Sequence, residues 1–401
     1  MATVVLVGTL DTKGAEYAWL RERVRELGCD VVLVDAGVGP SDVEADVPAD
    51  DVARAGGASL SALRDAGDRG AAVTAMGEGA AAVLAGLERV DAVLAVGGSG
   101  GSSIAARAVR DLPIGLPKVI VSTMASGDVS PYVGAKDVTL MYSVVDIAGV
   151  NRVSRLILGN AAGSAVGMAK AYEQARAAPA VDERPLVGAS MFGVTTPAVD
   201  AARQRLDELG YEVLVFHATG AGGRALEGLV ESGLLAGVLD LTTTELADDL
   251  VGGVLSAGPE RLTAAGRLGV PQVVAPGALD MVNFGPLETV PERFEGRNLY
   301  VHNPTVTLMR TTREEMAELG RRIAEKLRGA SGPTVLFLPL GGVSALDAPG
   351  MPFHDPEADE ACFAALDGAV ETERLDMDIN DPAFGRAMAD RLHRMISGGA
   401  Q

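Results

Sequence analysis

Three glycine-rich loops in the first half of the sequence have the composition of phosphate-binding loops. They are Gly8–Gly14 (GTLDTKG), Gly97–Ser103 (GGSGGSS) and Ser122–Asp128 (STMASGD). Glycines let backbone N–H groups approach a phosphate, a following helix adds the positive end of its dipole, and hydroxyl groups donate further hydrogen bonds. GTLDTKG matches neither the P-loop pattern GxxxxGK[ST] nor GxGxxG. The three loops together predict a nucleotide site, and the alternative is that their glycines only permit tight turns.

The residues predicted to bind the nucleotide share these loops and offer N–H groups, hydroxyl groups or the ammonium group of Lys13. They are Gly8, Thr9, Asp11, Thr12, Lys13, Gly97, Gly98, Ser99, Gly100, Gly101, Ser102, Ser122, Thr123, Met124, Ala125 and Gly127. Asp35 ends a predicted strand and is a candidate for binding a ribose hydroxyl, as in dinucleotide sites. A plain turn residue is the other interpretation of Asp35.

Polar side chains also follow the predicted strands of the second half. The candidates for general acid, general base or metal ligand are His217, Glu245, Asp280 and His302. The two histidines lie 85 residues apart, a spacing that fits no compact metal motif, so the metal ligands stay unassigned. Arg224 and Arg310 are candidates for holding an anionic substrate. The alternatives are structural histidines and solvated arginines.

These side chains need a scaffold that gathers strand ends at one edge. Short apolar runs such as Thr3–Val7, Ala92–Val96 and Lys118–Ser122 alternate with amphipathic helices, which indicates a parallel sheet covered on both faces. The pattern starts again at Leu186–Met191, and Leu299–His302 is predicted to be a further strand of the second sheet. The sequence therefore predicts an α/β protein with two Rossmann-like domains, residues 1–180 and 186–401. The linker is predicted at residues 177–185, and a binding cleft is expected between the domains.

The helices and loops of the first domain are predicted from the same periodicity. Residues 36–58 are polar and are predicted to form a long loop, followed by helical material from residue 60 to residue 87 with breaks at the DRG and GEG sequences. A helix over residues 147–177 is predicted to end the domain. After its first strand, the block from Pro117 to Gly163 is interpreted as a loop and helix start that wall the nucleotide site, and the alternative is an inter-domain or dimer contact.

Composition excludes several classes of function. The chain has 401 residues with 34 basic and 54 acidic side chains, a formal charge of −20, which argues against sequence-independent binding to nucleic acids or anionic membranes. No run of 18 apolar residues and no leader pattern is present, so a cytoplasmic location is expected. Cys29 and Cys362 are far apart and in no metal-binding spacing, and inert, reduced thiols are expected.

Longer stretches of the sequence resemble a known family. VGTLDTKGAE, VGGSGGSS and the block from Pro117 to Gly163 (PKVIVSTMASGDVSPYVGAKDVTLMYSVVDIAGVNRVSRLILGNAAG) are similar to the ATP-binding domain family named after the tomato mosaic virus resistance protein. HATGAGGRALE, DLTTTEL, VVAPGALDMVNFG and YVHNPTVTLMRTT carry the same resemblance. It implies two Rossmann-like subdomains, ATP with Mg²⁺ held mainly by the first, and a homodimer or higher homo-oligomer. Plant members carry a further barrel-like enzyme domain, so their antiviral role is not transferred.

Three functions are consistent with these observations. The first is an Mg²⁺-dependent, ATP-using enzyme, such as a transferase or ligase, that acts on a small metabolite. The second is a nucleotide-binding regulatory or interaction module without turnover. The third is an acid/base or metal-dependent isomerase or hydrolase in which the nucleotide is only structural.

Overall fold

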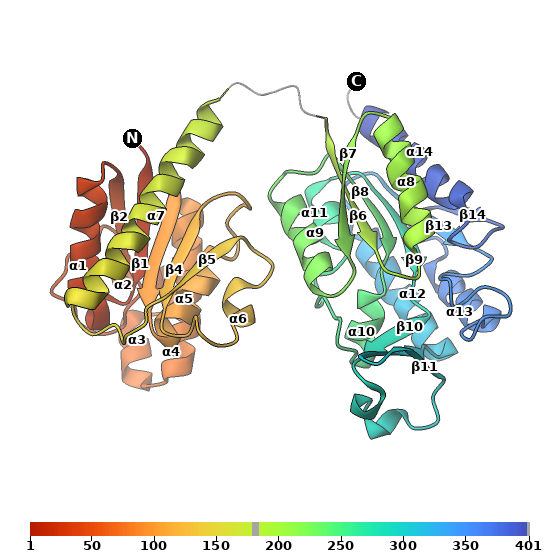
Figure 1. Cartoon of the computed structure of the whole chain (residues 1–401), viewed down its shortest axis with the longest axis horizontal. Helices are drawn as coiled ribbons and strands as arrows, with labels where there is room; N and C mark the ends of the chain where they lie inside the picture. Colours follow the sequence, from red (N-terminus) through yellow and green to blue (C-terminus); the bar gives the residue numbers. More distant parts are fainter. Residues whose placement is uncertain (179–183, 399–401) are drawn as a thin grey trace. The chain divides into compact units, whose positions relative to one another are not determined.

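The computed structural model describes residues 1–178 and 184–398. The chain divides into two compact units, Met1–Val181 and Asp182–Gln401, and each is built on its own parallel sheet (Figure 1). Most of the predicted linker lies outside the described residues. Apolar strands that alternate with helices form such sheets because both faces have to be covered. The predicted α/β fold with two Rossmann-like domains is confirmed.

The N-terminal unit contains a five-stranded parallel sheet in the order β2-β1-β3-β4-β5. Its strands are β1 (Thr3–Gly8), β2 (Asp30–Asp35), β3 (Ala92–Gly97), β4 (Lys118–Ser122) and β5 (Val138–Tyr142). Its helices are α1 (Leu10–Glu26), α2 (Ala49–Ala55), α3 (Leu60–Ala66), α4 (Arg69–Gly86), α5 (Ser99–Val109), α6 (Ser130–Val133) and α7 (Arg152–Ala177). Helices α1 and α7 cover one face of the sheet, and α2, α4 and α5 cover the other.

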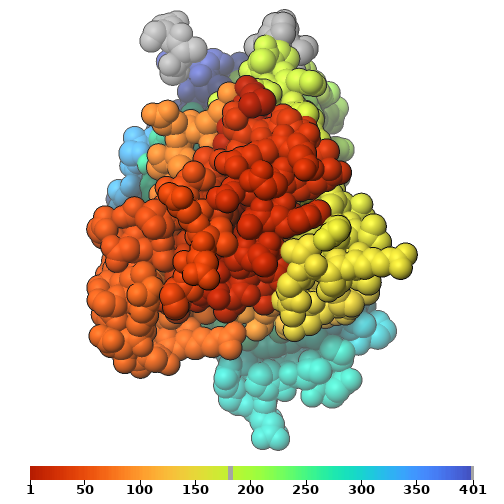
Figure 2. All heavy atoms as spheres, turned by 90° about the vertical axis from the view of Figure 1, so that its left-hand side faces the viewer, coloured from red at the N-terminus to blue at the C-terminus, as the bar shows by residue number. Residues whose placement is uncertain are grey.

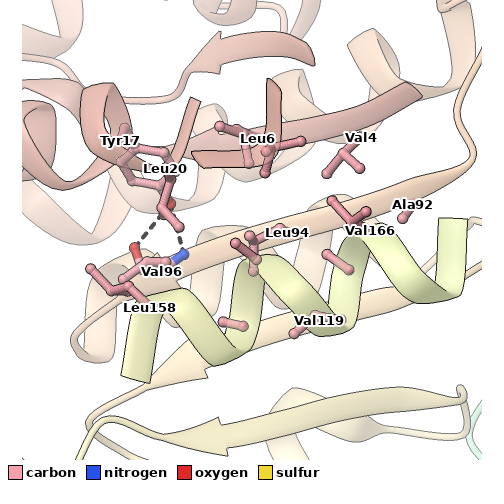
Figure 3. Close-up of a cluster of buried hydrophobic side chains, with 14 of the residues drawn as sticks. Val4, Leu6, Tyr17, Leu20, Ala92, Leu94, Val96, Val119, Leu158 and Val166 are labelled. Atoms are coloured by element: carbon pink, nitrogen blue, oxygen red, sulfur yellow. Dashed lines mark hydrogen bonds between the residues drawn. The ribbon is translucent and has the colours of Figure 1, made fainter. Parts of the chain in front are cut away.

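A buried tyrosine ties the two central strands of this sheet together. Side chains of α1 and α7 pack on β1 and β3, and Tyr17 of α1 lies among them (Figure 3). The Tyr17 hydroxyl donates to the carbonyl of Val7 (2.6 Å) and accepts from the N–H of Val96 (2.7 Å). Burial raises the pKa of Tyr17, so the hydroxyl keeps its proton. The carboxyl ends of β1 and β3 are therefore held at a fixed separation.

Four details of the N-terminal unit differ from the prediction. The predicted loop 36–58 contains α2, and β5 lies within the block that precedes the last helix. The predicted GEG break is wrong, because α4 continues unbroken through residues 77–79, whereas the predicted DRG break does separate α3 from α4: Gly67 adopts φ +61°, and the Asp68 carboxylate accepts from two N–H groups of the first turn of α4. Helix α7 begins at Arg152, five residues later than predicted, because Asn151 and Ser154 form a capping box there.

The C-terminal unit contains a six-stranded parallel sheet in the order β14-β13-β9-β8-β6-β7 and a three-stranded antiparallel sheet in the order β10-β12-β11. The parallel strands are β6 (Leu186–Met191), β7 (Glu212–His217), β8 (Gly237–Thr242), β9 (Gln272–Gly277), β13 (Thr334–Pro339) and β14 (Glu371–Leu375). The antiparallel strands are β10 (Met281–Phe284), β11 (Leu299–Asn303) and β12 (Val306–Arg310). The helices are α8 (Thr196–Glu208), α9 (Ala221–Glu231), α10 (Glu245–Val251), α11 (Ala264–Leu268), α12 (Arg313–Arg328), α13 (Pro356–Leu366) and α14 (Pro382–Gly398).

One strand of this unit is not where the sequence predicted it. β11 pairs with β12 in the antiparallel sheet and is not part of the parallel sheet. The prediction was wrong because a short apolar run such as LYVHN has the same pattern in either kind of sheet. His302, which lies on β11, therefore does not sit at the carboxyl edge of the parallel sheet.

Candidate functional site

A cavity of about 640 Å³ lies at the carboxyl ends of β1 and β3. This is the switch point of the sheet, because α1 leaves β1 on one face and α5 leaves β3 on the other, and ligands of open α/β sheets bind there. The walls come from the first turns of α1 and α5, from residues 36–39 after β2 and from α3 and α4. On the face shown in Figure 2, orange atoms of the α3–α4 region lie beside red atoms of the first forty residues.

The first turn of α5 supplies a polar wall of backbone N–H groups. The first hydrogen bond of the helix runs from Ser102 N–H to Gly98 carbonyl (2.8 Å), and no side chain caps this end. The N–H groups of residues 99–101 therefore have no acceptor within the helix. A Cβ on Gly97 would lie 2.8 Å from the Gly101 Cα, so glycine is what allows β3 to turn directly into α5.

Three basic side chains, Lys13, Arg64 and Arg69, line the cavity. The Arg69 side chain lies against Gly100, because a Cβ built there would be 3.4 Å from the guanidinium. Among the residues that the structure describes, neither Arg69 nor the Lys13 ammonium group forms an ion pair or hydrogen bond. Arg64, in contrast, donates to the carbonyls of Val38 and Gly39.

Much of the cavity lining is apolar. Val38, Leu63, Val73, Met76 and Ile104 contribute to it, and Met76 is fully buried. Such a wall is suited to a flat, weakly polar group, since ligand cavities combine apolar area with a few polar anchors. The cavity is therefore amphipathic: N–H groups and cations line it together with a hydrocarbon surface.

The structure brings half of the predicted nucleotide-binding residues to this cavity. Those that line it are Thr9, Asp11, Thr12, Lys13, Gly98, Ser99, Gly100 and Gly101. Those that do not line it are Gly8, Gly97, Ser102, Ser122, Thr123, Met124, Ala125 and Gly127. Ser102 and Ser122 are buried and bonded to each other (2.6 Å), so the loop after β4 supports the loop after β3 from behind.

Asp35 does not line the cavity, and its carboxylate forms hydrogen bonds within the fold. Its Oδ1 accepts from the N–H groups of Leu10 (3.1 Å) and Gly37 (2.8 Å), which joins the end of β2 to the turn after β1. Burial raises the pKa of Asp35. The interpretation as a turn residue fits this geometry better than the ribose-binding role.

The sequence did not identify the contribution of α3 and α4. Arg64, Arg69, Leu63 and Met76 lie in a stretch that was predicted only as helical. Their position becomes apparent only when α4 packs beside α5. The one local signal was the DRG break, where an N-cap aspartate is followed by an arginine at the start of a helix.

Glu245, a predicted catalytic residue, is fully buried and forms hydrogen bonds that stabilise the fold. Its Oε1 accepts from the N–H groups of Gly220 (2.6 Å) and Gly223 (3.0 Å) at the start of α9, and its Oε2 accepts from Arg261 (2.6 Å). Arg261 is also buried and forms two short bonds to Asp240, 2.5 and 2.6 Å long. Glu245 therefore caps a helix, and both of its oxygens are occupied.

Asp280 belongs to a separate buried cluster. Its Oδ2 accepts from Ser344 (2.7 Å), and burial raises its pKa to about 6. Arg310 donates to Asp347 (3.3 Å) and Asp359 (3.0 Å) and to main-chain carbonyls, so it is committed to this cluster and is not free for an anionic substrate.

The four predicted catalytic side chains do not share one hydrogen-bond network. Glu245 and Asp280 lie in separate hydrogen-bond networks, while His217 and His302 are exposed on strands of different sheets. At the switch point of the six-stranded parallel sheet, between β6 and β8, the hydroxyls of Thr195 and Thr242 are hydrogen-bonded to each other (2.8 Å). Among the described residues, no group of three His, Cys, Asp or Glu is placed to hold a metal ion.

The cluster around Arg310 predicts a pH dependence of stability. Burial, followed by the neighbouring Asp347 carboxylate, raises the pKa of Asp359 to about 8. The unfolded chain releases this proton near pH 4, whereas the folded protein holds it to about pH 8. The folded state then binds more protons in this range, so the free energy of unfolding falls as the pH rises from 4 to 8.

Replacing Asp359 with Asn should remove this contribution. We expect the free energy of unfolding of D359N, relative to the parent, to rise by about 2 kcal/mol between pH 5 and pH 8, given about 1.4 kcal/mol per pH unit as the upper limit for one proton. Urea unfolding of both proteins at the two pH values measures it. A constant difference between the two proteins would show that Asp359 is ionised throughout.

No helix in the described part of the chain is long and apolar enough to cross a membrane. The sequence matches two family models, described as the N-terminal domain (residues 2–174) and the C-terminal domain (residues 184–396) of the uncharacterised protein family UPF0261.

Relatives match along the whole chain. A UPF0261 protein of Clostridium tetani is 51% identical, and the alignment covers 98% of both chains. The ToMV resistance protein Tm-1(GCR237) of Solanum lycopersicum is 42% identical over 96% of this chain and 55% of that protein. A solved structure, UDP-N-acetylglucosamine 2-epimerase from Rickettsia bellii, aligns with a TM-score of 0.20 and 11% identity over 68% of this chain and 78% of that chain. With both halves matched by their models and full-length relatives at this identity, the chain belongs to the UPF0261 family.

Proposed function

We propose that the N-terminal unit binds ATP, with Mg²⁺, in the cavity at the ends of β1 and β3. The observation that carries the proposal is the pairing of a hydrocarbon wall with an uncapped helix N-terminus and unpaired cations in one cavity. The base packs against Val38, Leu63 and Val73, whose side chains are partly exposed in the cavity, and the phosphates accept from the N–H groups at the start of α5. The likeness to the family containing the tomato resistance protein supports the same ligand.

The residues at the cavity fit a magnesium ion. Asp11 Oδ2 accepts from the N–H of Gly39 (2.8 Å), whereas its buried Oδ1 has no hydrogen-bond partner in the described part of the chain. Mg²⁺ is bound in proteins by one or two carboxylates together with substrate phosphates and water. Asp11, with the hydroxyls of Thr9 and Thr12, would hold the ion, which would neutralise phosphate charge when bound.

Nucleotide binding is the function that the geometry supports best, and turnover stays a prediction. The ATP-using enzyme requires a second substrate site, and Glu245 and Asp280 are buried within scaffold networks. A binding module without turnover needs only the N-terminal cavity. We therefore propose that the protein binds ATP in this cavity.

Calorimetry with Mg²⁺·ATP on the parent protein and on Gly100→Asp tests the proposal. A Cβ at Gly100 meets nothing closer than the Arg69 guanidinium at 3.4 Å, so the aspartate fits and its carboxylate occupies the anion position beside Arg69. An acidic residue in the first turn of a helix is favourable, so the thermal midpoint should stay or rise. We expect about a 100-fold loss of ATP affinity, which corresponds to one strong charge-assisted hydrogen bond.

Gly100→Asn is the matched control, because it has the same size without the charge. It should bind ATP more tightly than Gly100→Asp. Absence of ATP binding by the parent protein, or equal affinity of the parent and Gly100→Asp, would refute the proposal.

A further inference from the structure

The position of Arg69 is electrostatically unfavourable in the protein by itself. Its guanidinium lies against Gly100 in the first turn of α5, where the helix presents the positive end of its dipole. The Lys13 ammonium group lines the same cavity. Cations are stabilising at the C-terminal end of a helix and destabilising at the N-terminal end. An anion between the guanidinium and the N–H groups of residues 99–101 would make all of these interactions favourable.

The C-terminal unit contains this arrangement with its anion built in. At the start of α9, the Glu245 carboxylate bridges the N–H groups of Gly220 and Gly223 on one side and the Arg261 guanidinium on the other. In the N-terminal unit, the start of α5 has an arginine beside it and no side-chain cap. The group that would satisfy the start of α5 is an oxyanion with two or more acceptor oxygens, and a phosphate has that geometry.

Arg64 shows that not every arginine of this turn is available to a ligand. It lies three residues before Gly67, and its guanidinium donates to the carbonyls of Val38 and Gly39 on the cavity rim. Asp68 is also engaged, because its carboxylate caps α4. Of the charged groups that α3 and α4 bring to the cavity, Arg69 is the cation left to interact with a ligand.

We propose that Arg69 and the first turn of α5 form the phosphate subsite, and that Arg69 makes affinity depend on the phosphates of the ligand while the apolar wall binds the base. This inference rests on the proposed function and deepens it by assigning one half of the ligand to one residue. It makes the preferred ligands nucleotides, with the unphosphorylated nucleoside bound only through the apolar wall.

The test compares ligands with and without phosphate on matched arginine variants. Calorimetry with ATP, adenosine and inorganic tripolyphosphate is run on the parent protein and on Arg69→Gln, Arg64→Gln and Arg110→Gln. In Arg69→Gln we expect ATP affinity to fall about 10- to 100-fold, the value of a charge-assisted contact, and adenosine affinity to change less than about twofold. Tripolyphosphate should compete with ATP in the parent protein and not in Arg69→Gln.

The two other variants separate charge from structure. Arg64→Gln loosens the rim of the cavity and should lower the affinities for ATP and adenosine by the same factor. Arg110 is exposed at the far end of α5, so Arg110→Gln should change neither affinity. Equal losses for ATP and adenosine in Arg69→Gln, or unchanged ATP affinity there, would overturn the role of Arg69 and leave ATP binding intact. A parent protein that binds tripolyphosphate but not ATP would support the phosphate subsite and refute the nucleotide proposal.

Discussion

Replacing Arg261 with Met should lower the free energy of unfolding by about 3–5 kcal/mol, the cost of removing one partner from a buried ion pair. Arg261 is fully buried and is bonded to Asp240, Glu245 and Glu227 at 2.5–3.3 Å. Methionine matches much of its volume but leaves two buried carboxylates, Asp240 and Glu245, and the half-buried Glu227 without their cation. The loss should therefore shrink at low pH, where the carboxylates take up protons.

Urea unfolding at pH 7.5 and pH 5 measures both parts of this prediction. Arg224→Met is the matched control: Arg224 lies on α9 close to the cluster in sequence, is exposed, and has one hydrogen bond to the carbonyl of Ser256 (3.0 Å). Its replacement should cost less than about 1 kcal/mol, as is usual for surface positions. Equal losses in the two variants would show that the buried carboxylates do not depend on Arg261.

The second large effect is expected for Gly8→Ala, which should lower the free energy of unfolding by about 3 kcal/mol. A Cβ on Gly8 would lie 2.0 Å from the Tyr17 ring, which is fully buried and cannot rotate away. The ring would have to shift, which combines overpacking with the loss of its bonds to Val7 and Val96. Gly8 thus has a packing role, although its place in a glycine-rich loop predicted contact with a nucleotide.

Thermal and urea unfolding of Gly8→Ala and Gly86→Ala test this prediction. A Cβ on Gly86, at the end of α4, meets no atom within 4 Å, so that variant should be neutral or slightly stabilised. A Gly8→Ala protein as stable as the parent would mean that Tyr17 moves without losing its bonds.

The fold could be predicted from the sequence because its pattern is local. An apolar run, a glycine-rich turn and an amphipathic helix follow one another, and the strand Lys118–Ser122 has the bounds that its residues predict. β11 could not be placed in its sheet, since pairing partners far along the chain decide between parallel and antiparallel neighbours. Helix α2 was missed because its residues are mostly polar and small.

The candidate site could be predicted only in its local part. The loops that begin α1 and α5 carry their signal in consecutive residues, and Lys13 and Gly98–Gly101 do line the cavity. Arg69 and Met76 reach it through the packing of α4 on α5, which has no local signal. In the C-terminal unit, Glu245 resembled a catalytic acid because a carboxylate after a strand looks the same in sequence whether it caps a helix or meets a substrate.

The hydroxyl of Tyr17 has a consequence for the kinetics of ligand capture. By holding Val7 and Val96 together, it fixes the spacing of the two loops that follow β1 and β3 before any ligand arrives. A ligand then gives up little conformational entropy of the protein on binding, because the walls are already preorganised. Association should consequently follow a single step whose rate rises linearly with ligand concentration, without a slow phase of loop closure.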